Sequence, residues 1–298
     1  MKVLVTGANG FVGGHLCRTL EAAGVEVVRA VRSSPSGAVV IGSINSTTDW
    51  SAVLEGVDAV VHLASRVHLM RDTVDDPLAA FRTVNVAGTL NLARQAVGAG
   101  VKRFVFISSI KADNPESDDF YGISKAEAEQ GLKEICSVSG MELVVIRPPL
   151  VYGPGVGANF LRLMKLAGSG LPLPLASVRN LRSLVYVGNL CDLIFQCLEN
   201  SSAAGQTFFV SDGQDVSTPE VLRRLAEAQG KRDRLFPFPV SLLHLAGRLT
   251  GRRAEIERLC GSLQIDISHA KKTLGWHPPV SLQRGILKTV EWFREKSV

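Results

Sequence analysis

The sequence has few cysteines and none in a metal-binding pattern. Only five occur among 298 residues, without any C-x-x-C pair: Cys17, Cys136, Cys191, Cys197 and Cys260. Disulfide frameworks and zinc sites need paired cysteines, whereas an odd, scattered set is typical of thiols in a reducing compartment. We therefore expect free thiols and no metal site.

The sequence also lacks a long apolar run. No stretch approaches the roughly 20 residues that a membrane-spanning helix needs. Met1-Lys2 leads directly into a short strand, without the apolar region or cleavage site of a signal peptide. We expect a cytoplasmic protein without a membrane span.

Charge of one sign is not concentrated anywhere along the chain. The 33 basic and 28 acidic residues leave a net charge of +5, and no basic run reaches five residues. Nucleic-acid binding needs a concentrated basic face, so we expect no nucleic-acid partner. The hydrophobic content of 46% and charged content of 20% are those of an ordinary globular protein.

Strand and helix patterns alternate through the first half of the chain. Apolar, β-branched runs that predict strands occupy residues 2–6, 25–31, 57–64, 101–108 and 142–147. Helical patterns occupy residues 13–23, 77–99 and 121–137. Continuous apolar strands are expected where both sheet faces are covered. The pattern predicts an α/β fold over residues 1–150, a Rossmann doubly wound parallel sheet.

The second half is less regular. Residues 152–180 are rich in Gly, Pro and Leu, while residues 219–229, 237–260 and 282–296 have helical patterns. Residues 182–187 and 206–210 resemble strands that return to the sheet. We expect residues 151–298 to form mainly a smaller C-terminal, substrate-binding lobe.

A glycine-rich turn follows the first strand. Gly7, Gly10 and Gly13 are spaced G-x-x-G-x-x-G between strand and helix. Gly7 permits a tight turn, Gly10 lets the backbone approach a pyrophosphate, and Gly13 lets the helix pack close to the sheet. The amides at the helix N-terminus then face the phosphates. This context predicts a dinucleotide site.

Arg32 follows the second strand, where NAD-binding versions of this turn place an acidic residue for the ribose diol. A guanidinium suits the 2′-phosphate of NADP, because it can bind that group through two hydrogen bonds. The sequence favours NADP(H) over NAD(H), although a solvated Arg32 and an enzyme that accepts either cofactor stay open.

Tyr121 and Lys125 lie four residues apart on one predicted helix. A free tyrosine has a pKa of about 10, so we expect the nearby ammonium to lower it. Lys125 can also bind the cofactor ribose. Ser108-Ser109 at the end of the 101–108 strand offers a hydroxyl for the substrate oxygen that Tyr121 protonates or deprotonates.

Together these motifs resemble the extended short-chain dehydrogenase/reductases of the NAD-dependent epimerase/dehydratase family. The matching segments are T-G-A-N-G-F-V-G at 6–13, H-L-A-S at 62–65, Asn85, S-S at 108–109, Y-G-I-S-K at 121–125 and R-P-P-L-V-Y-G-P at 147–154. The resemblance implies a catalytic triad of Ser109, Tyr121 and Lys125, with Asn85 in support. Together with the reasoning above, it implies the cofactor residues Gly7, Gly10, Phe11, Val12, Gly13, Arg32, Leu63, Ala64 and Lys125.

The same resemblance implies that the second half binds a UDP-linked sugar. Asn159 and Arg182 match residues that usually contact the sugar diphosphate, and Arg258 is a looser match for a second phosphate ligand. Two arginines are a reasonable cradle for a diphosphate. A homodimer is a further expectation by analogy with the family.

Departures from the family pattern narrow the predicted reaction. Ser109 is followed by Ile110-Lys111, without the carboxylates of the 4,6-dehydratases, and Leu150 replaces a family asparagine. With Arg32, these departures favour an NADPH-dependent reductase of a UDP-4-keto-6-deoxy-N-acetylhexosamine, as in O-antigen and capsule synthesis. The alternatives are a UDP-hexose 4-epimerase that retains NAD and, from another class, a non-catalytic NADP-binding redox sensor. Such sensors tend to lose the Tyr-Lys pair, which is intact here.

Overall fold

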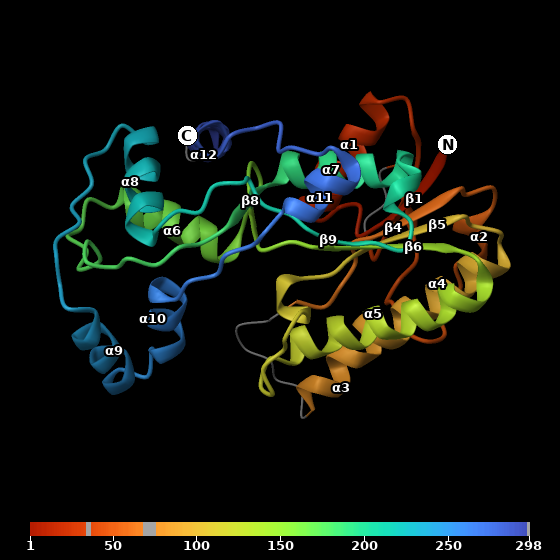
Figure 1. Cartoon of the computed structure of the whole chain (residues 1–298), viewed down its shortest axis with the longest axis horizontal. Coiled ribbons are helices and arrows are strands. Elements are labelled where there is room, and N and C mark those ends of the chain that lie inside the picture. Colours follow the sequence, from red (N-terminus) through yellow and green to blue (C-terminus); the bar gives the residue numbers. More distant parts are fainter. Residues whose placement is uncertain (34–36, 68–75, 297–298) are drawn as a thin grey trace. The chain divides into compact units, whose positions relative to one another are not determined.

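The computed structural model describes residues 1–33, 37–67 and 76–296. The chain forms two compact units (Figure 1). Unit 1 contains Met1–Pro148, Leu190–Val210 and Ile267–His277. Unit 2 contains Pro149–Asn189, Ser211–Asp266 and Pro278–Val298.

Unit 1 is built on a parallel sheet. In the described part of the chain this sheet has seven strands in the order β3-β2-β1-β4-β5-β6-β9, and every neighbouring pair is parallel. The strands are β1 (Lys2–Thr6), β2 (Glu26–Val31), β3 (Val39–Val40), β4 (Ala59–His62), β5 (Arg103–Ile107), β6 (Glu142–Arg147) and β9 (Thr207–Phe209). The predicted doubly wound α/β sheet is confirmed.

Helices cover both faces of this sheet. Figure 1 shows α4 and α5 on one face and α1, α7 and α11 on the other. The helical segments are α1 (Phe11–Ala22), α2 (Ser51–Leu54), α3 (Pro77–Phe81), η1 (Arg82–Gly88), α4 (Thr89–Gly98), η2 (Ile110–Ala112), α5 (Phe120–Ser139), α7 (Val187–Glu199, in unit 1 from Leu190), η3 (Ser201–Ala203) and α11 (Ser268–Leu274). The predicted continuous helix over 77–99 is therefore interrupted by η1, a π-helical turn.

The main core of unit 1 lies between the sheet and the α4–α5 layer. Phe104 and Phe106 of β5 are fully buried against Leu92 of α4 and Leu132 of α5. Small residues in the same layer, such as Ala96, let the helices approach the strands closely. Burying each large apolar side chain contributes about 1.5–3 kcal/mol, which holds α5 firmly at the sheet.

All five cysteines are free thiols, as expected. Cys17, Cys191 and Cys197 are buried, and burial raises the pKa of each thiol. A protonated thiol is a poor nucleophile, so these residues fill space in the core.

Unit 2 contains a small parallel sheet and a set of helices. Its elements are β7 (Leu150–Tyr152), α6 (Ala158–Gly168), β8 (Leu184–Tyr186), α8 (Thr218–Ala228), α9 (Val240–Leu249), α10 (Arg253–Cys260) and α12 (Leu282–Glu295). None of the helices in the described part of the chain combines the length and apolar character that crossing a membrane requires.

Two expectations for the second half are wrong in detail. The predicted strand over 182–187 does not return to the large sheet, because β9 pairs with the edge of β6 and β8 pairs with β7. The predicted helix over 237–260 is two helices, because the chain turns at Gly251, whose φ of +68° is a left-handed conformation that favours glycine. The strand predicted over 206–210 does join the large sheet, as β9.

Candidate active site

The glycine turn connects β1 to α1 as predicted. Gly7 has a φ of +66°, and a Cβ atom there would lie 3.1 Å from the amide nitrogen of Ala64. The amide of Gly10 donates to the Gly7 carbonyl over 2.9 Å. A Cβ at Gly13 would lie 2.1 Å from the same carbonyl oxygen, so only glycine fits.

The N-terminus of α1 lacks a side-chain cap. Gly10 occupies the N-cap position, and no side chain of the described residues caps the helix there. The first amides of a helix carry a partial positive charge and bind phosphate well. A glycine cradle beside such a terminus fits the pyrophosphate of a dinucleotide. Phe11 and Val12 lie in the first turn, at the positions the motif predicted.

A buried polar chain supports the Leu63–Ala64 segment. The amides of Leu63 and Ala64 both donate to Thr6 Oγ1 over 3.1 Å. The Thr6 hydroxyl therefore donates to His62 Nδ1 (2.7 Å), which leaves Nε2 to donate to Thr89 Oγ1 (3.0 Å). Burial lowers the pKa of His62 to about 3, so the ring is neutral. These hydrogen bonds were not predicted from the sequence, although a histidine inside an apolar strand was a visible signal.

Arg32 is exposed directly after β2. The end of β2 lies beside the glycine turn, because Asn9 Nδ2 donates to the Ser33 carbonyl over 3.5 Å and the Ala8 amide to the Ala30 carbonyl over 3.4 Å. Arg29, on the same strand, is held by Glu21 instead, with its Nη2 2.7 Å from each carboxylate oxygen. Arg32 thus lies where a residue next to the cofactor ribose is expected.

Ser109 and Tyr121 lie on two segments that pack closely together. Ser109 is buried and caps η2, its Oγ accepting from the Lys111 amide over 3.2 Å. Lys111 Nζ donates to Asp119 Oδ2 (2.8 Å), and Asp119 caps α5, which begins one residue before Tyr121. A Cβ at Gly122 would lie 2.7 Å from the Lys111 carbonyl oxygen, so this glycine permits the close approach.

Tyr121 is a neutral phenol in this structure. Burial raises its pKa to about 12; a hydrogen bond with Ser65 lowers the pKa, and the charge of Asp119 raises it. Our expectation that Lys125 lowers the pKa of Tyr121 below 10 is therefore wrong here. The desolvation of the hydroxyl dominates, and Lys125 Nζ lies 6.0 Å from the centre of the Tyr121 ring.

Lys125 is buried in the sheet–helix layer. Its side chain is almost fully inaccessible, with Nζ donating to the Ile107 carbonyl over 2.8 Å and lying 4.5 Å from the centre of the Phe106 ring. Burial lowers the pKa of Lys125 to about 7, and the charge of Glu129 opposes this shift. Lys125 therefore titrates near neutral pH.

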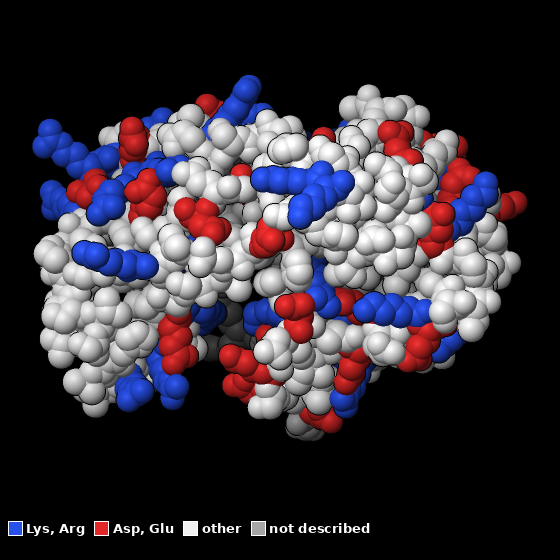
Figure 2. Space-filling view, viewed as in Figure 1, with Lys and Arg blue, Asp and Glu red and all other residues white. Residues whose placement is uncertain are grey.

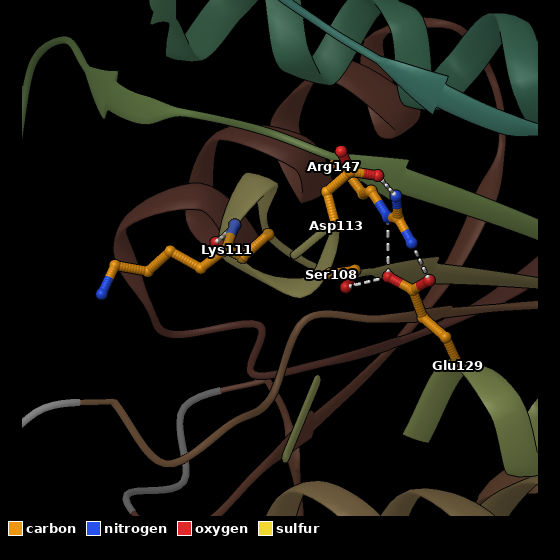
Figure 3. Close-up of polar contacts among 6 residues, drawn as sticks. Ser108, Lys111, Asp113, Glu129 and Arg147 are labelled. Atoms are coloured by element: carbon orange, nitrogen blue, oxygen red, sulfur yellow. Dashed lines mark hydrogen bonds and ion pairs between the residues drawn. The ribbon is translucent and has the colours of Figure 1, made fainter. Parts of the chain in front are cut away.

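Glu129 lies one helical turn after Lys125 and is part of a buried polar cluster (Figure 3). Arg147 at the end of β6 donates to both oxygens of Glu129, from Nε over 3.0 Å and from Nη2 over 2.7 Å. Ser108 Oγ donates to Glu129 Oε1 over 2.5 Å, and Arg147 also pairs with Asp113. Ser108 is thus hydrogen-bonded to Glu129. Of the two neighbouring serines, this leaves Ser109 as the candidate to bind the substrate oxygen.

Glu129 and Arg147 were not among the site residues predicted from the sequence. The available signals were the i, i+4 spacing from Lys125 and an arginine at the end of a buried strand.

Asn85 connects the segment after β4 to α5. It is buried in the π-helical turn η1. Its Oδ1 accepts from the Arg66 amide (2.7 Å), and its Nδ2 donates to the Arg66 carbonyl (3.1 Å) and to Ser124 Oγ (2.9 Å). Ser124 in turn donates to the Tyr121 carbonyl over 2.8 Å. The side chain therefore braces the first turn of α5, which carries Tyr121.

Unit 2 carries the three residues expected to bind substrate. Asn159 is exposed in the first turn of α6. Arg182 Nη1 donates to the carbonyls of Arg258 (2.7 Å) and Gly261 (3.1 Å), at the C-terminal end of α10. The structure thus brings Arg182 to the helix end that carries Arg258. One nitrogen of Arg182 is committed to these carbonyls, and burial lowers its pKa.

The sequence matches known proteins along nearly its whole length. The model of the NAD-dependent epimerase/dehydratase family matches residues 3–211. The UDP-glucose 4-epimerase of Vibrio cholerae is 45% identical over 312 aligned positions, which cover 98% of this chain and 95% of that protein.

Solved structures share the fold. The UDP-glucuronic acid 4-epimerase of Bacillus cereus, in complex with NAD, superposes with a TM-score of 0.78 at 22% identity, with full coverage of both chains. MoeE5 in complex with UDP-glucose and NAD gives a TM-score of 0.78 at 25% identity, again with full coverage of both. The chain therefore belongs to the NAD-dependent epimerase/dehydratase family and is an enzyme of the short-chain dehydrogenase/reductase type.

Proposed function

We propose that this enzyme is a 4-epimerase of a UDP-linked hexose. The observation that carries the proposal is the 45% identity to the Vibrio cholerae UDP-glucose 4-epimerase over 98% of the chain. The predicted triad of Ser109, Tyr121 and Lys125 supports it, because all three residues lie on or beside the first turns of α5. The epimerase proposal replaces the reductase that was favoured by the departures of the sequence from the family pattern.

The proposed chemistry moves one proton and one hydride at sugar C4. The nicotinamide cofactor, when bound, supplies a hydride acceptor and donor. Ser109 orients the C4 oxygen by a hydrogen bond, and Tyr121 accepts its proton during oxidation and returns it during reduction. A positive charge on Lys125 stabilises the phenolate during oxidation. The neutral phenol that the structure contains is the form that returns the proton.

Residues 151–298 supply the main part of the substrate site in this proposal. Asn159, Arg182 and Arg258 are the proposed contacts to the UDP diphosphate. Arg182 keeps part of its guanidinium for this role, because only its Nη1 makes the hydrogen bonds to the end of α10 described above. A homodimer and a cytoplasmic location belong to the same proposal.

The NADPH-dependent 4-keto-sugar reductase is the second candidate. Arg32 favours it: residues 27–33 contain no carboxylate to bind the ribose diol of NAD. A reductase consumes one hydride per turnover and must exchange its cofactor, whereas an epimerase returns the hydride to the same sugar. A non-catalytic redox sensor gains no support, because both Tyr121 and Lys125 are in place.

One assay separates these candidates. We expect the purified enzyme to interconvert UDP-glucose and UDP-galactose, or their N-acetyl forms, without net change in NAD(P)H absorbance. Denaturation should release bound dinucleotide. A reductase would instead oxidise NADPH stoichiometrically with a UDP-4-keto-6-deoxy-N-acetylhexosamine and transfer deuterium from C4-labelled NADPH to sugar C4. That result, without interconversion, would overturn the epimerase proposal.

A further inference from the structure

Helix α9 carries its apolar residues on the outside. Leu242, Leu245 and Leu249 recur at helical spacing and are 46%, 51% and 80% exposed. Ala246 is exposed between them. We call these four residues the apolar face of α9. A surface helix of a globular protein normally turns its polar residues to solvent, so this arrangement is inverted.

The opposite side of α9 is already occupied by α10. Leu243 is buried, and a Cβ atom at Gly247 would lie 2.7 Å from Ile256 Cγ1. The Arg252 amide donates to the Gly247 carbonyl over 2.7 Å, which fixes the turn between the helices. The two helices thus form a close hairpin within unit 2 (Figure 1). The residues of the apolar face stay exposed and lie outside this contact between helices.

Basic residues outnumber acidic ones in the segment that carries the apolar face. Residues 234–258 contain five arginines and two glutamates, Glu255 and Glu257. Arg248 and Arg252 are exposed, whereas Arg253 pairs with Glu257 over 2.6 Å. Figure 2 shows an uncharged surface over α9, with both Lys or Arg and Asp or Glu side chains beside it. Phe236, 40% exposed, precedes the helix.

We propose that the hairpin of α9 and α10 docks this enzyme on the surface of an anionic phospholipid membrane. Exposed leucines flanked by arginines are the pattern of a helix that lies in the membrane interface. The leucines enter the boundary between headgroups and acyl chains, and the arginines bind the phosphate groups. The negative surface potential of the bilayer attracts each basic residue, an attraction that salt screens.

The binding test uses the full-length enzyme and lipid vesicles. We expect it to float with vesicles that contain phosphatidylglycerol, to bind pure phosphatidylcholine more weakly, and to dissociate as salt rises. Leu245→Ser/Leu249→Ser should lower the partition coefficient at least about ten-fold, because each substitution removes apolar surface that would otherwise enter the membrane interface. Val138→Ser/Leu287→Ser, which removes two exposed apolar side chains elsewhere, should bind like the unaltered enzyme.

Three results would overturn the proposal: no flotation with either vesicle, flotation that the leucine substitutions leave unchanged, or loss of flotation in the Val138/Leu287 control as well. If the leucine double variant instead turns a dimer into a monomer and no form binds vesicles, a second copy of the chain covers this face. Circular dichroism checks that each variant folds. Leu249→Ser alone, at the most exposed position, provides a milder variant. None of these measurements requires epimerase activity.

Discussion

Arg147 and Glu129 form a buried two-point ion pair, from Nε to Oε1 over 3.0 Å and from Nη2 to Oε2 over 2.7 Å. Their side chains are 14% and 3% exposed. The pair holds the Glu129 carboxylate one helical turn from Lys125. The negative charge of this carboxylate opposes the loss of the Lys125 proton. The Glu129–Arg147 pair, which joins α5 to β6, thus also affects the charge of Lys125.

Glu129→Gln should therefore move the pH dependence of catalysis. The pKa of Lys125, about 7, falls when the carboxylate charge is removed. Because the charged lysine stabilises the phenolate, activity declines as the pH rises through this pKa, and the alkaline limb of kcat/KM should shift to lower pH. The exposed Glu134→Gln on the same helix is the control. An unchanged profile in Glu129→Gln would show that the pair is structural only.

The same substitution should destabilise the fold. Removing one partner of a buried ion pair leaves the other without compensation, at a cost of about 3–5 kcal/mol. Urea unfolding of Glu129→Gln and Glu134→Gln measures this difference. Equal free energies of unfolding would contradict the buried pair.

Tyr121→Phe should abolish turnover and leave dinucleotide affinity nearly unchanged. Losing one general acid–base group costs about 100- to 10,000-fold in rate, whereas the glycine turn holds the dinucleotide. Steady-state assays and fluorescence titration with NADH and NADPH measure the two effects. A variant that retains more than about a tenth of the activity would rule out Tyr121 as the proton-transfer residue.

Arg32→Ala tests cofactor choice. Losing a charge-assisted hydrogen bond to phosphate costs about 1.5–3 kcal/mol, or roughly ten-fold or more in affinity. NADPH binding should weaken by this factor and NADH binding should barely change. Arg29→Ala removes an arginine held by Glu21 and should affect neither cofactor. Equal losses of both cofactors in Arg32→Ala would show that Arg32 does not contact the 2′-phosphate.

Substitution by alanine should have opposite effects on stability at two neighbouring glycines. A Cβ at Gly13 meets the Gly7 carbonyl at 2.1 Å, so Gly13→Ala should cost about 1–3 kcal/mol or more and weaken dinucleotide binding. At Gly14 the nearest contact is 3.8 Å, and alanine is the better helix former by about 1 kcal/mol. Gly14→Ala should therefore keep or raise the melting temperature. Calorimetry with and without dinucleotide checks both, and a stable, cofactor-binding Gly13→Ala would contradict the packing.

Local sequence patterns were sufficient to predict the parallel sheet and the glycine turn. Buried parallel strands are short continuous apolar runs, and β1 and β6 begin and end where their runs do. The Tyr121–Lys125 spacing likewise placed both residues on α5. These features depend on neighbours within one element, which is why periodicity predicts them.

Long-range packing decided the rest. The edge of β6 pairs with β9 rather than β8, a choice between two short apolar strands that no local pattern distinguishes. The pKa of Tyr121 rises rather than falls, because burial of the hydroxyl in the folded chain outweighs its hydrogen bond with Ser65. The Glu129–Arg147 pair joins residues 18 positions apart across a helix and a strand. Residue types and spacing thus predict what each element can do, but desolvation and pairing partners exist only once the elements are packed.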